Sequence, residues 1–451
     1  MRGRGNGLPA KPGRRARMSF MRGGFAGYNR IEGHTMSANR LSTQTRTRAS
    51  RTLSPAVQHA LRFTETYKAH RDSHPATREA ACLRVQFPAV FGPIEPDDMF
   101  AGGNNRDRIC YIGSIWWAMF PDKRGPGKQG GYCFDFAAGK RFARTTADRK
   151  AIAELESYWA EECTVAKAFA SWDDEMRALL RRRCTPVVGG APGFCLALEL
   201  DRLLQHGLPG TATLVEERMA RARCEGETDK LPFLQALLDA LDVVVGVCRH
   251  YEAQARELAA AAQDAGDRAR LERIAAALEA LVRRAPESLF EAIQLWWLYS
   301  VMAGGLHIEG WRIDEAFGDF YASDIDRGRL TEEQAQEMVC GLWRIYYKHS
   351  DLHVSRAIIG GKGRRNEAHA DRFALAAMEA TRRTRQVIPQ LTLRFYDGQN
   401  PALMRKAFDV IGEGCTYPML YNDDVNIPAV EKALHARPGD AARYYPLGCG
   451  E

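Results

Sequence analysis

The sequence lacks several features that mark particular classes of protein. None of its 11 cysteines stands in a Cys-x-x-Cys pair, and no Cys/His cluster has the spacing of zinc ligands. It has no run of 18 apolar residues, because Glu291, Gln294 and Ser300 interrupt the most apolar stretch, 289–304. No apolar signal-peptide core follows the N-terminus. We therefore expect a cytoplasmic protein with reduced thiols, no bound metal and no membrane helix.

Acidic residues are almost absent from residues 1–52, which hold 11 Arg, one Lys and a single acid, Glu32. The chain carries a formal charge of +7, so a tail of +11 leaves a body of −4. A mildly acidic body gives no electrostatic reason to expect a nucleic-acid partner. The tail composition favours a disordered extension, while a transit peptide and a nucleic-acid-binding arm remain alternatives.

From Leu53 onward the composition is that of a folded protein, and most of it reads as helix. Residues 53–150 predict a short helix and irregular segments, because apolar runs alternate there with Gly, Pro and Asn. Helices are predicted over 149–183, 212–282 and 286–303, and Thr331–Gln334 predicts a capping box that opens a helix to about Lys348. One helical face is indicated by Leu271, Ile274, Leu278 and Leu281.

After residue 350 strand and helix patterns alternate. Strands are predicted at 354–359, 390–395 and 419–421, and helices at 370–383, 401–412 and 428–435. This order predicts an α/β fold, either a barrel or a doubly wound sheet. The Gly-rich run 360–364 lacks the spacing of a phosphate loop and is interpreted as a short turn.

The C-terminal run Gly-Cys-Gly-Glu, 448–451, carries the strongest chemical signal. Two flanking glycines leave Cys449 sterically bare, so that a reactant can approach its sulfur closely. Glu451, two residues on, is placed to act as a base beside the thiol. By itself the run also fits an ordinary loop cysteine, since no histidine is adjacent.

Several motifs in this order resemble those of the glycyl radical enzymes, the superfamily of pyruvate formate-lyase and related dehydratases and lyases. Residues 448–451 resemble the Gly-Cys-x-Glu loop of that family, and 414–425 its Gly-x-Pro-x-x-x-Asn-Asp-Glu segment. Further similar segments lie at 389–394, 310–315, 290–294 and 249–255. The resemblance spans roughly residues 80–451 and is closer to the dehydratase and lyase branch.

This resemblance implies a helix-rich N-terminal part and the first part of a ten-stranded α/β barrel. It implies that Cys449 becomes a thiyl radical that takes a hydrogen atom from a small-molecule substrate, and that Glu451 then accepts a proton. It also implies a partner, an S-adenosylmethionine-dependent activase, which installs a glycyl radical on a residue outside this chain. No cofactor would be bound directly, and the full-length enzyme would be a homodimer.

The same resemblance suggests further substrate-binding residues: Asp135, His307, Asp314, Asn422 and Asp423. Two departures leave the substrate open. Gly450 replaces the usual Val, and the segment before Gly310 is short. Pyruvate formate-lyase itself uses two adjacent cysteines, whereas Leu447-Gly448-Cys449 supplies one, so acyl transfer is the disfavoured alternative.

We expect two parts, a basic tail over 1–52 and a pyruvate formate-lyase-like domain over 53–451 that lacks the glycyl radical loop. An incomplete barrel leaves open sheet edges and is expected to fold poorly alone. The leading hypothesis is a radical lyase or dehydratase, inactive as this fragment. The alternatives are a truncated or degenerate non-catalytic subunit and a nucleic-acid binder that acts through the tail.

Overall fold

A computed structural model describes residues 53–103, 143–162, 200–303, 312–349 and 356–446, with a few positions between 167 and 178. All of these residues belong to one compact unit, Ala49–Glu451. The basic tail lies outside the described residues.

The first described helices are α1 (Pro55–Ala69), α2 (Pro75–Gln86) and α5 (Thr146–Glu162). The sequence predicted a single short helix before residue 150, whereas α1 and α2 are two full helices, each with proline in its first turn. Helices α1, α2 and α5 share a separate apolar core that contains Phe63 and Trp159. Trp159 Nε1 donates to Thr64 Oγ1 at 3.0 Å, so its buried polar atom is satisfied.

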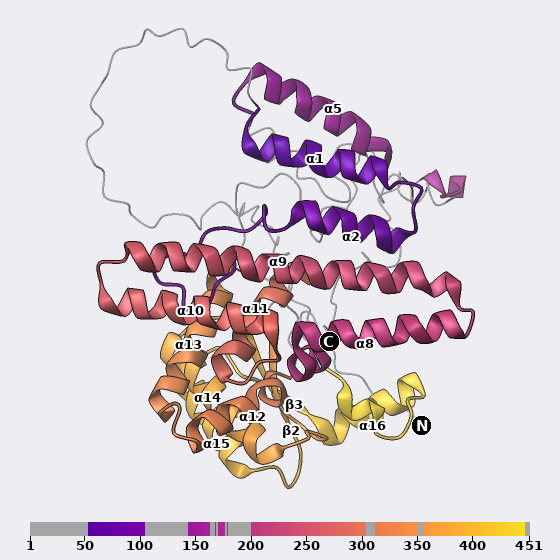
Figure 1. Ribbon diagram of the computed structural model, residues 1–451. Coiled ribbons are helices and arrows are strands. Elements are labelled where there is room, and N and C mark those ends of the chain that lie inside the picture. The colour runs from indigo at the N-terminus through magenta and orange to yellow at the C-terminus, as the bar shows by residue number, and fades with distance from the viewer. Residues whose placement is uncertain are drawn as a thin grey trace, which may run out of the picture. The chain divides into compact units, whose positions relative to one another are not determined.

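Three long helices follow: α8 (Asp201–Cys224), α9 (Leu231–Ala261) and α10 (Ala265–Arg283). The predicted helical span 212–282 is therefore divided, and Asp264 caps α10 by accepting the backbone N–H of Asp267. Helix α9 packs against α10, α8 and α2, which lie beside it in Figure 1. The predicted apolar face of α10 is confirmed as core, since all four of its residues are buried.

Helix α9 also has the length and composition of a membrane-spanning helix. Its apolar stretch contains Asp239 and Asp242, and its buried residues include Val247, Cys248 and Tyr251. A core helix of a globular domain passes the same test. Its packing against α10, α8 and α2 supports that interpretation.

The next three helices are α11 (Leu289–Ala303), α12 (Ile313–Asp326) and α13 (Glu332–His349). The capping box before α13 is confirmed, because Thr331 and Gln334 each accept the other's backbone N–H, at 3.1 and 2.9 Å. Trp296 and Trp297 are fully buried in the main core. Helix α12 was not predicted from the sequence.

The α/β prediction is confirmed after residue 350. Strands β1 (Arg356–Gly360), β2 (Gln390–Phe395) and β3 (Met419–Asn422) form a parallel sheet in the order β1-β2-β3. Helices α14 (Glu367–Thr384), α15 (Pro401–Gly412) and α16 (Asp423–Leu434) follow the strands in turn. Helix α16 begins five residues earlier than predicted, because Asn422 caps it directly at the end of β3.

The two faces of this sheet differ in chemistry. One face carries Ala357, Ile359, Leu391 and Leu393, all buried in the main core with residues of α14. The other face carries Arg356, Thr392, Arg394 and Tyr421 at the alternate register positions. Arg356 donates to Thr392 Oγ1 at 3.1 Å. Apolar packing therefore fixes the register of the strands, and the register aligns the polar residues.

Candidate active site

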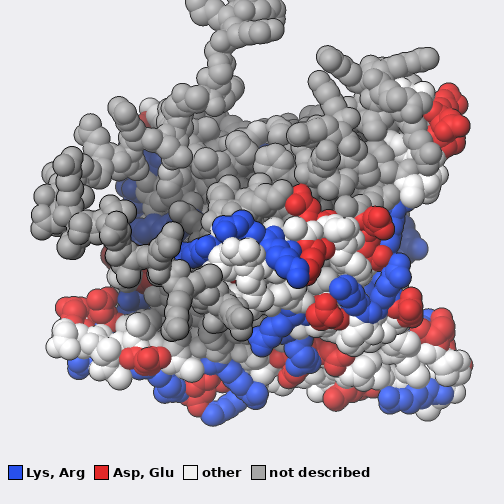
Figure 2. Space-filling view, turned by 90° about the horizontal axis from the view of Figure 1, so that it is seen from above, with Lys and Arg blue, Asp and Glu red and all other residues white. Residues whose placement is uncertain are grey.

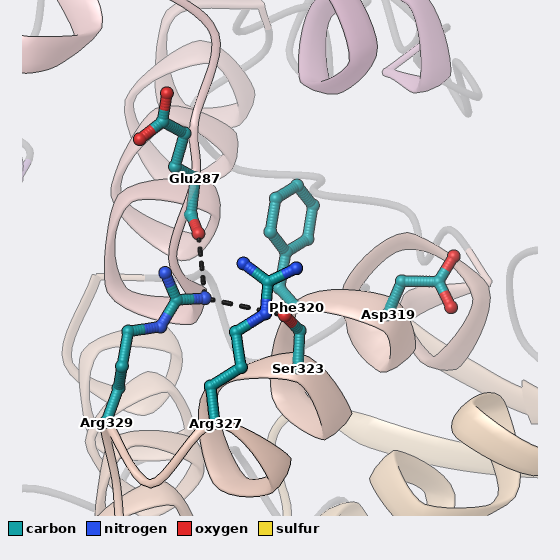
Figure 3. Close-up of a pocket in the computed structure, with 6 residues that line it drawn as sticks. All are labelled: Glu287, Asp319, Phe320, Ser323, Arg327 and Arg329. Atoms are coloured by element: carbon teal, nitrogen blue, oxygen red, sulfur yellow. Dashed lines mark hydrogen bonds between the residues drawn. The ribbon is translucent and has the colours of Figure 1, made fainter.

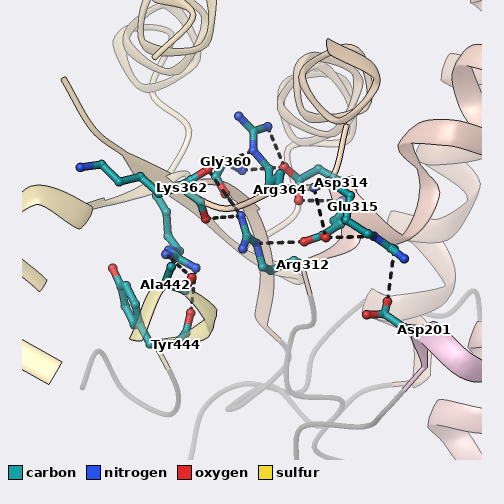
Figure 4. Close-up of polar contacts among 12 residues, drawn as sticks. Asp201, Arg312, Asp314, Glu315, Gly360, Lys362, Arg364, Ala442 and Tyr444 are labelled. Carbon is teal, nitrogen blue, oxygen red and sulfur yellow. Dashed lines mark hydrogen bonds and ion pairs between the residues drawn. The ribbon is translucent and has the colours of Figure 1, made fainter. Parts of the chain in front are cut away.

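Parallel strands end at the same edge of a sheet, and in open α/β sheets ligands bind outside the carboxyl ends of the strands. In this chain that edge holds charged and polar residues from five segments far apart in the sequence. We call them the strand-end network: Arg312, Asp314, Arg364, Arg394, Asp423 and Tyr444, with the loop 360–364. Figure 4 shows much of this network.

At the centre of the network Arg394 and Asp423 form a buried ion pair in which both side chains are 0% exposed. Arg394 Nε and Nη2 donate to the two carboxylate oxygens at 2.9 and 2.8 Å, the bidentate geometry that a guanidinium permits. Asp423 also accepts the backbone N–H of Lys362 at 2.8 Å and the Tyr444 hydroxyl at 2.8 Å. The pair thus joins β2, α16, the loop after β1 and the 440s.

Two glycines at the end of β1, Gly360 and the following Gly361, make room for this ion pair. Gly360 and Gly361 have φ of +74° and +85°, a region that side chains disfavour. A Cβ on Gly360 would lie 2.3 Å from the Arg394 carbonyl oxygen, and one on Gly361 would lie 2.8 Å from Asp423 Oδ2. The Gly-rich run is therefore a tight bend against a buried ion pair, as the turn interpretation expected.

Arg394 also holds the chain just before its C-terminal run. Its Nη1 donates to the carbonyl oxygen of Tyr444 at 2.8 Å, and its Nη2 to that of Ala442 at 2.9 Å. The guanidinium carbon lies 4.1 Å from the centroid of the Tyr444 ring. Asn426 Nδ2 donates to the Tyr444 hydroxyl at 3.1 Å. The stretch 442–446 is thereby attached to the strand ends.

On the other side of the loop, Arg312 and Asp314 come from the start of α12 (Figure 4). Arg312 Nη2 donates to the carbonyl oxygens of Gly360 and Lys362, each at 3.1 Å. Asp314 Oδ2 accepts the Gly360 N–H at 2.7 Å and Arg364 Nη1 at 3.2 Å. Arg312 also forms an isolated parallel bridge with Ile358 of β1.

Burial shifts the pKa of several of these groups. Desolvation raises the pKa of the Asp314 carboxyl, although Arg364 and Arg312 oppose the shift. Burial lowers the pKa of the Arg312 guanidinium, with Asp314 opposing it. Burial, with the nearby Asp423, raises the pKa of Tyr444 to about 12, so Tyr444 stays a phenol at neutral pH and donates to Asp423.

Four of the predicted site residues, Cys449, Glu451, His307 and Asp135, lie outside the described residues. The structure brings the other three to one edge. Asp314 and Asp423 are buried and bonded to the chain's own donors, and Asn422 accepts the Asp424 N–H at 2.9 Å as a helix cap. Their roles in substrate binding stay predictions.

Sequence reasoning assigned no site role to Arg312, Arg364, Arg394 or Tyr444. Arg394 has a visible signal, because it occupies a polar position in a strand, 390–395, whose neighbouring positions are apolar. A charge at such a position in a covered sheet requires an acidic partner. Which acid it meets depends on how the strands are ordered.

A pocket beside α12 is a separate feature of the described part of the chain. Its volume is about 340 Å³, and it lies beside the second half of α12 (Figure 3). Arg329 closes one side by donating to the Glu287 carbonyl oxygen at 3.2 Å, and it forms a close ion pair with Asp324. Arg329 is thus bonded within the chain, which gives this pocket no clear ligand. No group of metal-ligating side chains occurs among the described residues.

On the face shown in Figure 2, blue and red residues are interspersed over the described surface. A nucleic-acid site usually has its basic residues clustered on one face. The described residues of this face therefore give no support to nucleic-acid binding by the body.

Known proteins similar to this chain were found by sequence and by structure. The pyruvate formate lyase-like family profile matches residues 31–451. A probable dehydratase, YbiW of Escherichia coli, is 24% identical over 88% of this chain and 51% of its own length. Isethionate sulfite-lyase of Oleidesulfovibrio alaskensis is 24% identical over 56% of this chain and 33% of its own length.

A solved structure concerned with 1,2-propanediol dehydration in Roseburia inulinivorans superposes with a TM-score of 0.70. It is 21% identical, and the match covers 87% of this chain and 51% of that one. The parallel strands and the helices that follow them thus form the first part of a barrel of the glycyl radical enzyme type, as predicted. The chain spans about half the length of this structure and of the E. coli relative. Because the family profile covers most of the sequence, the chain belongs to the pyruvate formate lyase-like family of glycyl radical enzymes.

Proposed function

We propose that this chain is the cysteine-bearing half of a glycyl radical lyase that eliminates a leaving group from a small molecule. The observation that carries the proposal is the family match to residue 451, which includes the Gly-Cys-Gly-Glu run. Relatives named as a dehydratase and as a sulfite-lyase favour elimination. We further propose a cytoplasmic homodimer that needs an S-adenosylmethionine-dependent activase.

The strand-end network supports this proposal through chain connectivity. Pro446 is the last described residue and precedes Cys449 by three positions. Three residues span at most about 11 Å, so the proposal requires the chemistry of Cys449 to take place within about that distance of Pro446. Ligands of α/β folds bind at this edge.

In the proposed reaction, one-electron chemistry comes from a glycyl radical installed by the activase. Cys449 would pass its thiol hydrogen atom to that glycyl position, where a C–H bond forms as the S–H bond breaks. Its sulfur would then take a hydrogen atom from a substrate C–H bond. A new S–H bond forms, and a carbon radical remains on the substrate. Glu451 accepts a proton from the neighbouring substituent, and the adjacent leaving group departs with its bonding electron pair. Return of the hydrogen atom from Cys449 to the product radical completes the cycle.

Two alternatives are kept. Acyl transfer of the pyruvate formate-lyase type is disfavoured, because residue 448 is Gly where a second adjacent cysteine would be needed. A non-catalytic subunit would retain the fold but would accept no radical.

The test uses the natural gene product that contains this chain, activated anaerobically by its activase. Electron paramagnetic resonance reports whether a radical forms, and product analysis follows 1,2-propanediol, glycerol, isethionate and trans-4-hydroxyproline. We expect a radical and turnover of one such compound. Cys449→Ala should abolish turnover while leaving the radical in place.

Cys415→Ala is the matched control, because it removes a free thiol in the connection before β3, away from the proposed radical position. Turnover by Cys449→Ala near the wild-type rate contradicts the thiyl role. No radical with a competent activase overturns the radical mechanism. The same absence of a radical favours the non-catalytic subunit, whereas a radical without turnover of any compound in the panel contradicts elimination of these leaving groups.

A further inference from the structure

Within the strand-end network, Arg394 bonds to the backbone of the stretch 442–446, which precedes Cys449. Arg394 directs four N–H groups at named acceptors: two carboxylate oxygens of Asp423 and the carbonyl oxygens of Ala442 and Tyr444. Two of those acceptors belong to the short stretch that leads into Cys449. A lysine could not replace this arrangement, because an ammonium is a point donor without a planar fork.

We propose that Arg394, oriented by Asp423 and stacked on Tyr444, is the positioning residue that fixes the approach of the Cys449 segment to the active site. This inference rests on the proposed function of Cys449 and deepens it. Arg394 touches no reacting atom in this scheme and acts only through the backbone at 442 and 444.

Three features fit positioning better than general stability. Helical bonds are made only by the first residues of the stretch, since the 3-10 turn ends at Arg443 and 444–446 belong to no helix or strand. Both carbonyls depend on one guanidinium, which is itself 0% exposed. Asp423 orients both partners of this contact, because its two carboxylate oxygens accept from Arg394 and one of them also accepts the Tyr444 hydroxyl. Burial raises the pKa of Tyr444 to about 12, which widens the pH range over which its hydroxyl can donate.

The Gly360–Arg364 loop connects the Arg394–Asp423 pair to Arg312, the residue that follows the segment containing His307. Arg312, which follows the segment with His307 directly, donates to the carbonyl oxygens of this loop. Lys362, in the same loop, donates its backbone N–H to Asp423. Arg312 and the stretch 442–446 therefore belong to one connected set of hydrogen bonds that runs through the loop, Asp423 and Arg394.

The experiment measures the reactivity of Cys449 in the purified protein, without activation. Iodoacetamide labelling followed by mass spectrometry gives a separate rate for each cysteine, and hydrogen exchange reports the amides of 442–446. Cys224 is exposed and serves as the reference for reagent strength. Cys248 is fully buried in α9 and becomes reactive only on unfolding.

The main variant is Arg394→Met with Asp423→Asn, which removes both buried charges together so that neither is left alone. We expect the Cys449 rate, relative to Cys224, to rise at least about tenfold, and 442–446 to exchange faster, as loss of charge-assisted bonds implies. Cys248 should stay protected. Unchanged Cys449 reactivity and exchange, with Cys248 protected, would overturn the proposal.

If Cys248 becomes reactive in that variant, the variant has unfolded, and two milder single substitutions then test the positioning role. Tyr444→Leu removes the ring under the guanidinium and the hydroxyl, whereas Arg443→Leu alters the exposed neighbour. We expect roughly threefold faster labelling of Cys449 in Tyr444→Leu only, since stacking and one hydrogen bond are lost. Equal rates in the two variants would refute positioning.

The experiments distinguish a failure of the proposed function from a failure of the positioning inference. If Cys449→Ala retained turnover in the activated protein, Cys449 would not be the thiyl, yet the labelling result would still report whether Arg394 fixes the segment. If Cys449 is the thiyl and the positioning inference holds, the double variant should lose kcat with little change in KM.

Discussion

In the α9–α10 hairpin the buried residues are apolar and the ion pairs lie at the surface. Leu278 is 0% exposed, whereas Arg256 of α9 and Glu279 of α10, 2.6 Å apart, are 54% and 33% exposed. At the strand ends the charges themselves are buried, and Arg394 and Asp423 are both 0% exposed. The same pair of chemical groups thus occurs in two environments of one chain.

The two regions are stabilised by different interactions. An apolar helix face gains free energy from every buried methylene, so its contributions are local and roughly additive. A buried carboxylate and guanidinium have lost their hydration, and their attraction repays that loss only when every donor and acceptor is paired. The network should therefore respond to single substitutions far more sharply than the hairpin does.

The largest effect is expected at Asp423. Asp423→Ala leaves the Arg394 guanidinium buried without its carboxylate and should lower the free energy of unfolding by about 4 kcal/mol. Urea unfolding followed by circular dichroism measures this change.

The double variant Arg394→Met with Asp423→Asn is the control for that prediction, because it removes both charges at once. It should cost clearly less than Asp423→Ala alone. Equal losses in the two variants would mean that the buried charge is not the source of the effect, and the contrast with the hairpin would weaken.

A smaller effect is expected in the hairpin core. Leu278→Ala creates a cavity in the fully buried face of α10 and should lower the free energy of unfolding by about 3 kcal/mol. Exposed Leu214 of α8 supplies the control, and Leu214→Ala should cost a small fraction of that value. A similar cost at both positions would show that burial does not govern this region.

Much of the fold was predictable because its signals are local. The period of Leu271, Ile274 and Leu278 placed a buried helix face, and all three residues are buried. The Thr331–Gln334 capping box and the strand at 390–395 were also found where expected. Helix α12 lacks such local signals, because Arg312 makes no side-chain cap bond at its start and Gly318 lies in its interior.

The candidate site was predictable only in part. The family motifs predicted Asp314 and Asp423 as site residues. No local pattern, however, pairs Asp423 with Arg394, which lies 29 residues earlier in the chain. That pairing needs β2 and β3 to be adjacent and parallel, which is a property of the whole sheet. The bonds from Arg394 to the 440s depend in addition on the path of the chain after α16.

The smallest effect is expected for the surface pair of the hairpin, which tests the comparison most directly. Glu279→Gln removes the charge that Arg256 and Arg283 both contact at 2.6 Å. Because water and salt screen these exposed groups, the free energy of unfolding should fall by no more than about 0.5 kcal/mol, and that difference should shrink further in 1 M salt. Urea unfolding at two salt concentrations measures it. A salt-independent loss comparable to that of Asp423→Ala would mean that burial does not separate the two ion pairs, and the contrast between the two regions would have to be abandoned.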